Sequence, residues 1–278
     1  MKHDMSEKDI QNPGSALGEA VGSQLEIVLN EHLTQFVDKF SCRLVSKGQK
    51  NQKTKKATKL LLYDQFGTSY NIDAVIANES MQPLILLEYK YLRYKKHNRD
   101  KGSWLCTAHN AIRRRYTSVR SSIAILAGNW SGTSLAMMRS QEINLFVIPF
   151  QRIVDLLQKH DIVFDWGEKD RETAKDAWKK YERLAAQEKR SIAENMIASV
   201  KPELETLVGK ILDDQTPREL SKVVIEIHSN LGEIRYFEFP DTRSAVEFLE
   251  DFSIDEILDH ANAFTLFDKP VAEEQMFL

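Results

Sequence analysis

The residues YNIDAVIANESMQPLILLEYKY (70–91) contain two candidate strands and most of the chemistry-bearing side chains of this sequence. Residues 70–77 are rich in β-branched and aliphatic side chains, and residues 83–91 are apolar at the start and charged at the end. We therefore expect a strand in each segment. Alternation along the second strand places Glu88 and Lys90 on the same face of a sheet. If the two strands pair as a hairpin, Asp73 lies beside Glu88.

The sequence on either side of this hairpin predicts a layered α/β domain. Apolar residues at helical spacing between 17 and 40 indicate an amphipathic helix, and residues 59–66 are expected to form another strand. Beyond the hairpin, helical spacing over 104–119 is followed by two continuously apolar strands, 122–127 and 143–148, with a short helix between them. Continuous apolar character is typical of strands covered on both faces. The order predicts an antiparallel meander that continues partly in parallel, which gives a mixed central sheet.

The chain is expected to divide into four parts. Residues 1–16 are polar and are expected to form a flexible arm, and residues 17–165 form the α/β domain. Residues 166–214 are predicted to be a charged helical connector. Residues 215–278 are predicted to form a small α+β module, because two alternating strands flank Asn230-Leu231-Gly232, which is a hairpin signal.

Composition excludes several classes of protein. The 278 residues are 42% hydrophobic and 28% charged, which is typical of a globular chain with ample material for a core. No apolar run approaches the roughly 20 residues that span a bilayer, and the polar start lacks the apolar core of a signal peptide. Only Cys42 and Cys106 are present, which excludes a disulfide framework. We therefore expect an intracellular, cytoplasmic protein without a membrane partner.

The net charge of -3 conceals an uneven distribution. Residues 1–120 carry 20 Lys and Arg against 12 Asp and Glu, whereas residues 203–278 carry 6 against 18. A basic front suggests a polyanionic partner. The acidic tail should not lie against nucleic acid. It is either a simple soluble module or a surface that faces another protein.

The paired carboxylates of the hairpin suggest a metal site. Adjacent Asp73 and Glu88 repel each other, and a divalent cation would relieve that repulsion. Oxygen ligands suit Mg²⁺, with Mn²⁺ as a possible substitute. Lys90 stands where an ammonium can orient or help to deprotonate water, or stabilise charge on a phosphate. The alternative is a salt-bridge cluster on an exposed sheet end.

These residues resemble the motif of the PD-(D/E)xK nuclease superfamily, which includes most type II restriction endonucleases. Asp73 and Glu88-Tyr89-Lys90 match the motif, and Ile72 stands where the family usually has proline. The resemblance covers about residues 17–150 and implies a restriction-endonuclease-like three-layer α/β/α core. It further implies that Asp73 and Glu88 bind the metal. It also implies that an acid on the first helix assists them, with Glu26 the best match and Glu19 the reserve.

Basic and aromatic residues follow the motif closely. Between Glu88 and Arg120 there are ten Lys and Arg against two acids, with tyrosines and Trp104 among them. Such a surface fits a polyanion, because neutralising phosphates releases counterions. The alternative is ordinary solvated surface. The candidate nucleic-acid-binding residues are Lys53, Lys55, Lys95, Lys96, Arg99, Arg113 and Arg114.

Four other residues give weaker signals. His97 and His109 have no second histidine at metal-ligand spacing, and the helical spacing of His109 predicts partial burial. Asn110, on the same helix as His109, is a minor candidate for reaching the site. Cys106 lacks the His and Asp partners of a cysteine nucleophile.

Together these observations predict a Mg²⁺-dependent endonuclease that hydrolyses DNA phosphodiester bonds, acting in defence against foreign DNA by family-level inference. The catalytic residues would be Asp73, Glu88, Lys90 and Glu26. A homodimer is expected if both strands are cut, with the helices of 168–212 as candidates for the contact. The acidic module would then suit a protein partner. The alternatives are an inactive binding protein of the same fold, and a nuclease of RNA or branched DNA.

Overall fold

The computed structural model describes residues 12–48, 59–94, 98–167 and 169–255. The chain forms two compact units, which divide between Asp214 and Gln215. The first unit is an α/β structure built on a five-stranded mixed sheet. Its elements are α1 (Pro13–Val37), a 3₁₀ turn (Asp38–Phe40), β1 (Arg43–Ser46), β2 (Leu60–Tyr63), β3 (Ser69–Ile72), β4 (Ala74–Ala77), β5 (Pro83–Leu92), α2 (Asn98–Arg115), β6 (Ser121–Gly128), α3 (Gly132–Ser140), β7 (Ile143–Pro149), α4 (Phe150–Gln158), α5 (Arg171–Arg183), α6 (Ala186–Ile197) and α7 (Lys201–Leu212).

The central sheet has the strand order β1-β4-β5-β6-β7. The pairs β1/β4 and β4/β5 are antiparallel, and β5/β6 and β6/β7 are parallel. Ala74 pairs with Leu87 in the register of β4 and β5, so the preceding Asp73 comes opposite Glu88. The predicted mixed sheet and the predicted hairpin are both confirmed.

The strand expected over residues 70–77 is two strands. β3 pairs with β2 in a separate two-stranded sheet, whereas β4 belongs to the central sheet. The chain bends at Asp73 between them. At this bend the carboxylate accepts a hydrogen bond from the Tyr89 backbone N–H, and the carbonyl accepts one from the Lys47 N–H. Asp73 therefore marks the junction of the two sheets.

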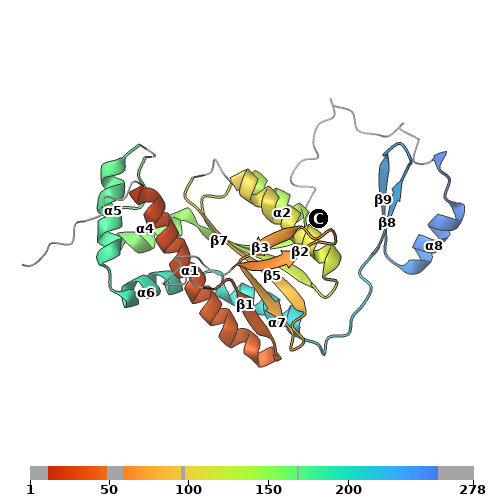
Figure 1. Ribbon diagram of the computed structural model, residues 1–278, viewed down its shortest axis with the longest axis horizontal. Coiled ribbons are helices and arrows are strands. Elements are labelled where there is room, and N and C mark those ends of the chain that lie inside the picture. Colours follow the sequence, from red (N-terminus) through yellow and green to blue (C-terminus); the bar gives the residue numbers. More distant parts are fainter. Residues whose placement is uncertain (1–11, 49–58, 95–97, 168, 256–278) are drawn as a thin grey trace, which may run out of the picture. The chain divides into compact units, whose positions relative to one another are not determined.

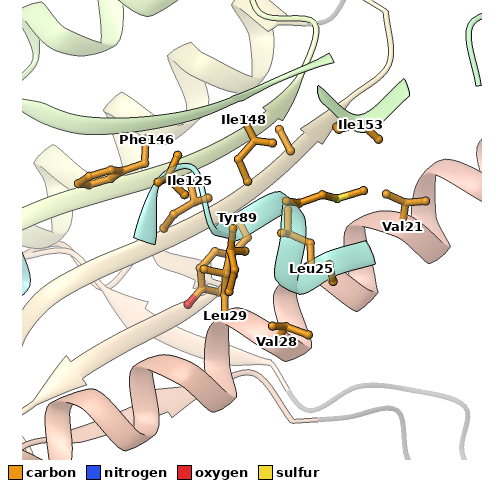
Figure 2. Close-up of a cluster of buried hydrophobic side chains, with 14 of the residues drawn as sticks. Val21, Leu25, Val28, Leu29, Tyr89, Ile125, Phe146, Ile148 and Ile153 are labelled. Atoms are coloured by element: carbon orange, nitrogen blue, oxygen red, sulfur yellow. The ribbon is translucent and has the colours of Figure 1, made fainter. Parts of the chain in front are cut away.

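Helices cover both faces of the central sheet (Figure 1). On one face α1 and α4–α7 enclose the largest core cluster, and on the other α2 and α3 pack over smaller clusters. Figure 2 shows part of the large cluster, in which α1 meets the sheet and α4. The side chains labelled there are Val21, Leu25, Val28, Leu29, Tyr89, Ile125, Phe146, Ile148 and Ile153.

The first helix begins earlier than expected. Residues 13–16 are the first turn of α1, although the sequence predicts them to belong to a flexible arm. Asn12 caps the helix by accepting a hydrogen bond from the Ser15 N–H at 3.1 Å, and Pro13 suits the first helical position because it has no N–H to satisfy. The rest of the predicted arm, residues 1–11, lies outside the described residues.

Residues 166–214 are part of the first unit and do not form a connector. The apolar sides of α5, α6 and α7 are buried in the same cluster as α1, through side chains such as Ala177, Ile192 and Leu204. Only the polar outer surfaces of these helices remain for a dimer contact of the kind the sequence suggests.

The described part of the second unit consists of two strands and one helix. Its described elements are β8 (Val223–His228), β9 (Ile234–Phe239) and α8 (Thr242–Asp251), and the two strands form an antiparallel hairpin. Phe237 and Phe239 stack against Phe248 of α8, with ring centroids 4.4 and 5.1 Å apart. Alternation puts the aromatic face of β9 on the helix.

None of the helices in the described ranges has the length and apolar character needed to cross a membrane.

Gly128, the last residue of β6, permits a close approach to the end of β5. Its φ is +101°, and a Cβ atom there would lie 2.0 Å from the Leu92 carbonyl oxygen. We expect Gly128→Ala to lower the free energy of unfolding by about 2 kcal/mol or more, because it adds both backbone strain and a clash with rigid backbone. Urea denaturation measures this loss. Gly132→Ala is the matched control, since nothing lies within 4 Å of its added Cβ, and an equal loss in both variants would contradict the explanation.

Candidate functional site

Three acids and two lysines from separate elements meet at one end of the sheet. Asp73 lies at the β3–β4 junction, Glu88 and Lys90 project from β5, Glu26 comes from α1, and Lys47 follows β1. We call these five residues the acid–lysine cluster. Four of them are the predicted catalytic residues, and the structure brings all four together.

Lys90 joins the two carboxylates of the hairpin. Its Nζ lies 2.8 Å from Asp73 Oδ2 and also contacts Glu88 Oε2. The exposed fraction of the side chain is 7% for Asp73 and zero for Glu88, compared with 21% for Lys90. The ammonium is thus the part of this trio that solvent or a ligand reaches most easily.

Lys47 connects Glu26 to the trio, and sequence reasoning missed it. Its Nζ lies 2.8 Å from Asp73 Oδ1 and 3.0 Å from Glu26 Oε2. In the sequence, Lys47 looks like the first member of a lysine-rich loop, because the short strand β1 before it is not evident. A strand over Arg43–Ser46 that pairs with β4 was the signal that would have placed Lys47 opposite Asp73.

Backbone and aromatic contacts hold the cluster in place. The Tyr89 N–H donates to Asp73 Oδ2 at 2.9 Å, which ties the β3–β4 junction to β5. On the opposite face of β5, the Tyr89 hydroxyl donates to Asn30 Oδ1 of α1, also at 2.9 Å. One residue of β5 therefore fixes both the acid of the neighbouring strand and the helix that carries Glu26.

The two hairpin carboxyls have opposite pKa shifts. Burial, against the opposing charge of Lys90 and with the help of nearby Asp73, raises the pKa of Glu88 to about 8. Burial also acts to raise the pKa of Asp73, but a hydrogen bond with Glu88 and the ammoniums of Lys90 and Lys47 outweigh it and lower this pKa. Near neutral pH the pair therefore holds one proton, on Glu88.

The cluster has a suitable donor set for a hard divalent cation, although its charges are now balanced by lysines. Among the described residues no three acidic, His or Cys side chains stand in a ready metal-binding group. Lys47 pairs with Glu26 and Asp73, and Lys90 pairs with Asp73 and Glu88. Glu88 Oε1 is buried and has no hydrogen-bond partner, so this oxygen is available to a ligand. Asp73 and Glu88 thus fit Mg²⁺, which prefers carboxylate oxygens.

Helix α2 closes one side of the cluster. The Trp104 ring lies beside Lys90, with Nζ 5.8 Å from its centroid. His109 is completely buried rather than partly exposed, and neither ring nitrogen has a hydrogen-bond partner. Burial, assisted by the charges of Lys90 and Arg113, lowers the pKa of His109 to about 3, so this imidazole is neutral.

The three candidate nucleic-acid-binding residues that the structure describes, Arg99, Arg113 and Arg114, do not form one patch around the cluster. Arg99 is exposed near the start of α2, and Arg114 is exposed near its end, roughly 20 Å away at 1.5 Å per residue. Arg113 is half-buried and lies 3.6 Å from Glu142, and basic residues in a last helical turn also complement the helix dipole. Lys53, Lys55, Lys95 and Lys96 lie outside the described residues.

The structure describes most of the residues that the sequence offers as weaker site candidates. Asn110 donates to Gln141 Oε1 at 2.9 Å and so is directed to α3 rather than to the cluster. Cys106 is buried, and burial raises the pKa of its thiol, which opposes a nucleophilic role. Glu19, the reserve for Glu26, is exposed on α1. His97 lies outside the described residues.

Comparisons of the chain with models of protein families, with curated proteins and with solved structures found no match. What the chain does is therefore inferred from its own residues and their geometry.

The raised pKa of Glu88 predicts an unusual pH dependence of stability in the metal-free protein. Between its ordinary value of 4.5 and about 8, Glu88 keeps a proton in the folded state that the unfolded chain releases, so the stability from this group is lost as pH rises through that range. Glu88→Gln should flatten the profile and raise the melting temperature at pH 8 by about 3 °C or more. Thermal unfolding in EDTA from pH 5 to pH 8 measures it. Glu19→Gln, at an exposed position, should keep the wild-type slope, and a wild-type slope in Glu88→Gln would contradict the assignment.

Proposed function

We propose that the chain is a Mg²⁺-dependent nuclease of the restriction-endonuclease-like, PD-(D/E)xK type, which hydrolyses DNA phosphodiester bonds. The observation that carries the proposal is the convergence of Asp73, Glu88 and Lys90 at the end of β5, with Glu26 joined to them through Lys47. The mixed sheet with helices on both faces supports the same assignment. A role in defence against foreign DNA remains part of the proposal through the family resemblance alone.

Hydrolysis needs three things: an activated water, a phosphate held in place, and stabilisation of the negative charge that develops on the phosphate in the transition state. Asp73 and Glu88 would hold the Mg²⁺, which would supply Lewis acidity at the phosphate and help to activate the attacking water. The ammonium of Lys90, already beside both carboxylates, orients water or neutralises a phosphate oxygen. Lys47 and Glu26 complete the charge balance at the outer side of the cluster.

The lysines explain how the acids remain together before a metal binds. Three unpaired carboxylates in a half-buried site would repel one another strongly. Each ammonium bridges two of them, so the cluster is assembled before any ligand arrives. Preorganisation of this kind favours catalysis, because little rearrangement is left for the reaction itself. The same ion pairs also suit the alternative, an inactive binding protein, and metal binding separates the two.

Asp73→Asn should abolish binding of Mg²⁺ and Mn²⁺, because it removes the charge at the centre of the cluster while conserving the shape of the side chain. Isothermal titration calorimetry of the purified protein measures this. Asp155→Asn, at an exposed position on α4, is the matched control and should bind as wild type does. Absence of metal binding by the wild-type protein would exclude the enzyme proposal and favour the inactive alternative.

Lys90→Ala should reduce cleavage of DNA in Mg²⁺ by about 100-fold or more, the usual contribution of a positioned proton-transfer group, while DNA binding changes little. Cleavage of plasmid and of linear, single-stranded, branched and RNA substrates, followed on gels, measures the rate and shows the substrate class. Lys159→Ala, exposed after α4, is the control and should cleave normally. Loss of binding together with cleavage in Lys90→Ala would contradict the assigned role.

A further inference from the structure

A cavity of about 770 Å³ extends from the acid–lysine cluster along the first half of α1. Glu26 and Lys90 line one end of it, so it is continuous with the cluster. The remaining walls come from the end of β5, the start of α5 and the segment before α5. The nuclease proposal uses none of these walls.

Two glycines of α1 shape this cavity. A Cβ atom on Gly18 would lie 3.0 Å from Tyr91 Cε1, and one on Gly22 would lie 3.3 Å from Tyr91 Cβ. Both glycines therefore allow the ring of Tyr91 to lie directly against the helix. The ring fills the space under α1, and the residues that follow Tyr91 turn into the cavity wall.

Arg93 is the unusual side chain of this wall. Its exposed fraction is only 8%, and its guanidinium lies 3.3 Å from the centroid of the Trp166 ring. One nitrogen, Nη2, donates to the Trp166 carbonyl at 3.1 Å, whereas Nε and Nη1 have no hydrogen-bond partner. No ion pair of Arg93 with an acid is found among the described residues.

A buried cation without a counter-ion is expensive, and the surroundings compensate only in part. The rings of Tyr94 and Phe164 lie 5.2 Å from the guanidinium, and together with Trp166 they provide cation–π attraction. Such contacts offset only part of the cost of removing a cation from water. An anion that enters the cavity and accepts hydrogen bonds from Nε and Nη1 would provide the rest, and arginine suits phosphate in particular.

The other charged side chains along the cavity balance in number, which leaves Arg93 as the cation in excess there. Lys101 and Arg171 line it together with the acids Glu19 and Asp170. The Asp170 carboxylate is already engaged as the cap of α5, where it accepts from the Thr173 N–H and hydroxyl. Arg171 is exposed at the first position of that helix.

The volume of the cavity and its aromatic walls limit the kind of ligand that can bind there. A volume of 770 Å³ falls within the range of roughly 300–1,000 Å³ found for small-molecule pockets. A cube of that volume has an edge of about 9 Å. The major groove, which is only part of a DNA duplex, is already ~12 Å wide. A double helix is therefore too wide to enter. Single nucleotides fit, and aromatic rings beside a basic group are the usual platform for unpaired bases.

We propose that this cavity binds an unpaired nucleotide of the substrate strand next to the scissile bond, with its phosphate at Arg93. The inference rests on the proposed nuclease function and narrows its substrate to nucleic acid with a single-stranded segment at the cluster.

Binding of a fluorescein-labelled dT10 oligonucleotide to the full chain in EDTA, followed by fluorescence anisotropy, tests the proposal without cleavage. Arg93→Met should weaken binding about tenfold or more, because it keeps an apolar side chain of similar length against Trp166 but removes the charge. Arg152→Met, exposed on α4, removes the same charge outside the cavity and should bind as wild type does. The affinity for a labelled blunt hairpin duplex should fall less than twofold in Arg93→Met.

Wild-type affinity of Arg93→Met for dT10, or an equal loss for the blunt duplex, would overturn the inference. Circular dichroism checks that this variant folds. If it does not, Arg171→Met decides, since its exposed position carries little risk to folding. A loss of about threefold in dT10 affinity would support the cavity, and an unchanged affinity would refute it.

The two proposals fail in different ways. If wild-type protein cleaves DNA in Mg²⁺ while Arg93→Met binds dT10 normally, the nucleotide cavity is wrong and the nuclease function stands. If no metal binding or cleavage is found but dT10 binding depends on Arg93, the nuclease function is wrong and the cavity stands as a single-strand-binding site.

Discussion

The hydrogen bonds and ion pairs of the Asp73 carboxylate join the elements that meet at the acid–lysine cluster. This carboxylate accepts the backbone N–H of Tyr89 and the ammoniums of Lys90 and Lys47, and its own residue is the bend at which the chain passes from one sheet to the other. These contacts bring a strand, a sheet junction and, through Lys47, the helix carrying Glu26 to a single place. The charge responsible for the proposed chemistry is thus also a structural charge, so the cluster cannot be changed without affecting how the elements meet.

Residues 70–91 contain enough information to predict the central pairing, because the alternation of side chains on β5 and the apolar character of β4 are both local properties. Glu88 and Lys90 could be assigned to one face from their spacing alone. Lys47 could not, because its role follows from the pairing of the four-residue strand β1 with β4, which is a long-range property. The helices after residue 166 were misassigned for a related reason: their charged outer sides dominate the composition, whereas the apolar sides that pack on α1 are narrow.

Buried charge is balanced differently in the acid–lysine cluster and at Arg93. In the cluster every acid is near an ammonium, and the proton held by Glu88 near neutral pH removes one negative charge more. At Arg93, three residues after Lys90, a guanidinium is buried against aromatic rings and a carbonyl, and no acid of the described ranges pairs with it. Satisfied charges stabilise the folded chain, and an unsatisfied one favours a ligand of opposite sign. The cavity is thus lined both by members of the balanced cluster, Glu26 and Lys90, and by the unbalanced cation of Arg93.

The two units also differ in their balance of charged residues. The acidic excess of residues 203–278 begins within α7 and continues through the second unit, which packs its own aromatic cluster around Phe248. A unit that carries this charge repels the polyanion that the first unit is proposed to bind. On the exposed side of its hairpin, Glu238 pairs with Lys222 and Glu226 lies 2.6 Å from His228, so the acidic excess comes from the other acids of this segment. This composition opposes binding of a polyanion by the second unit, whereas the first 120 residues carry the basic excess that favours it.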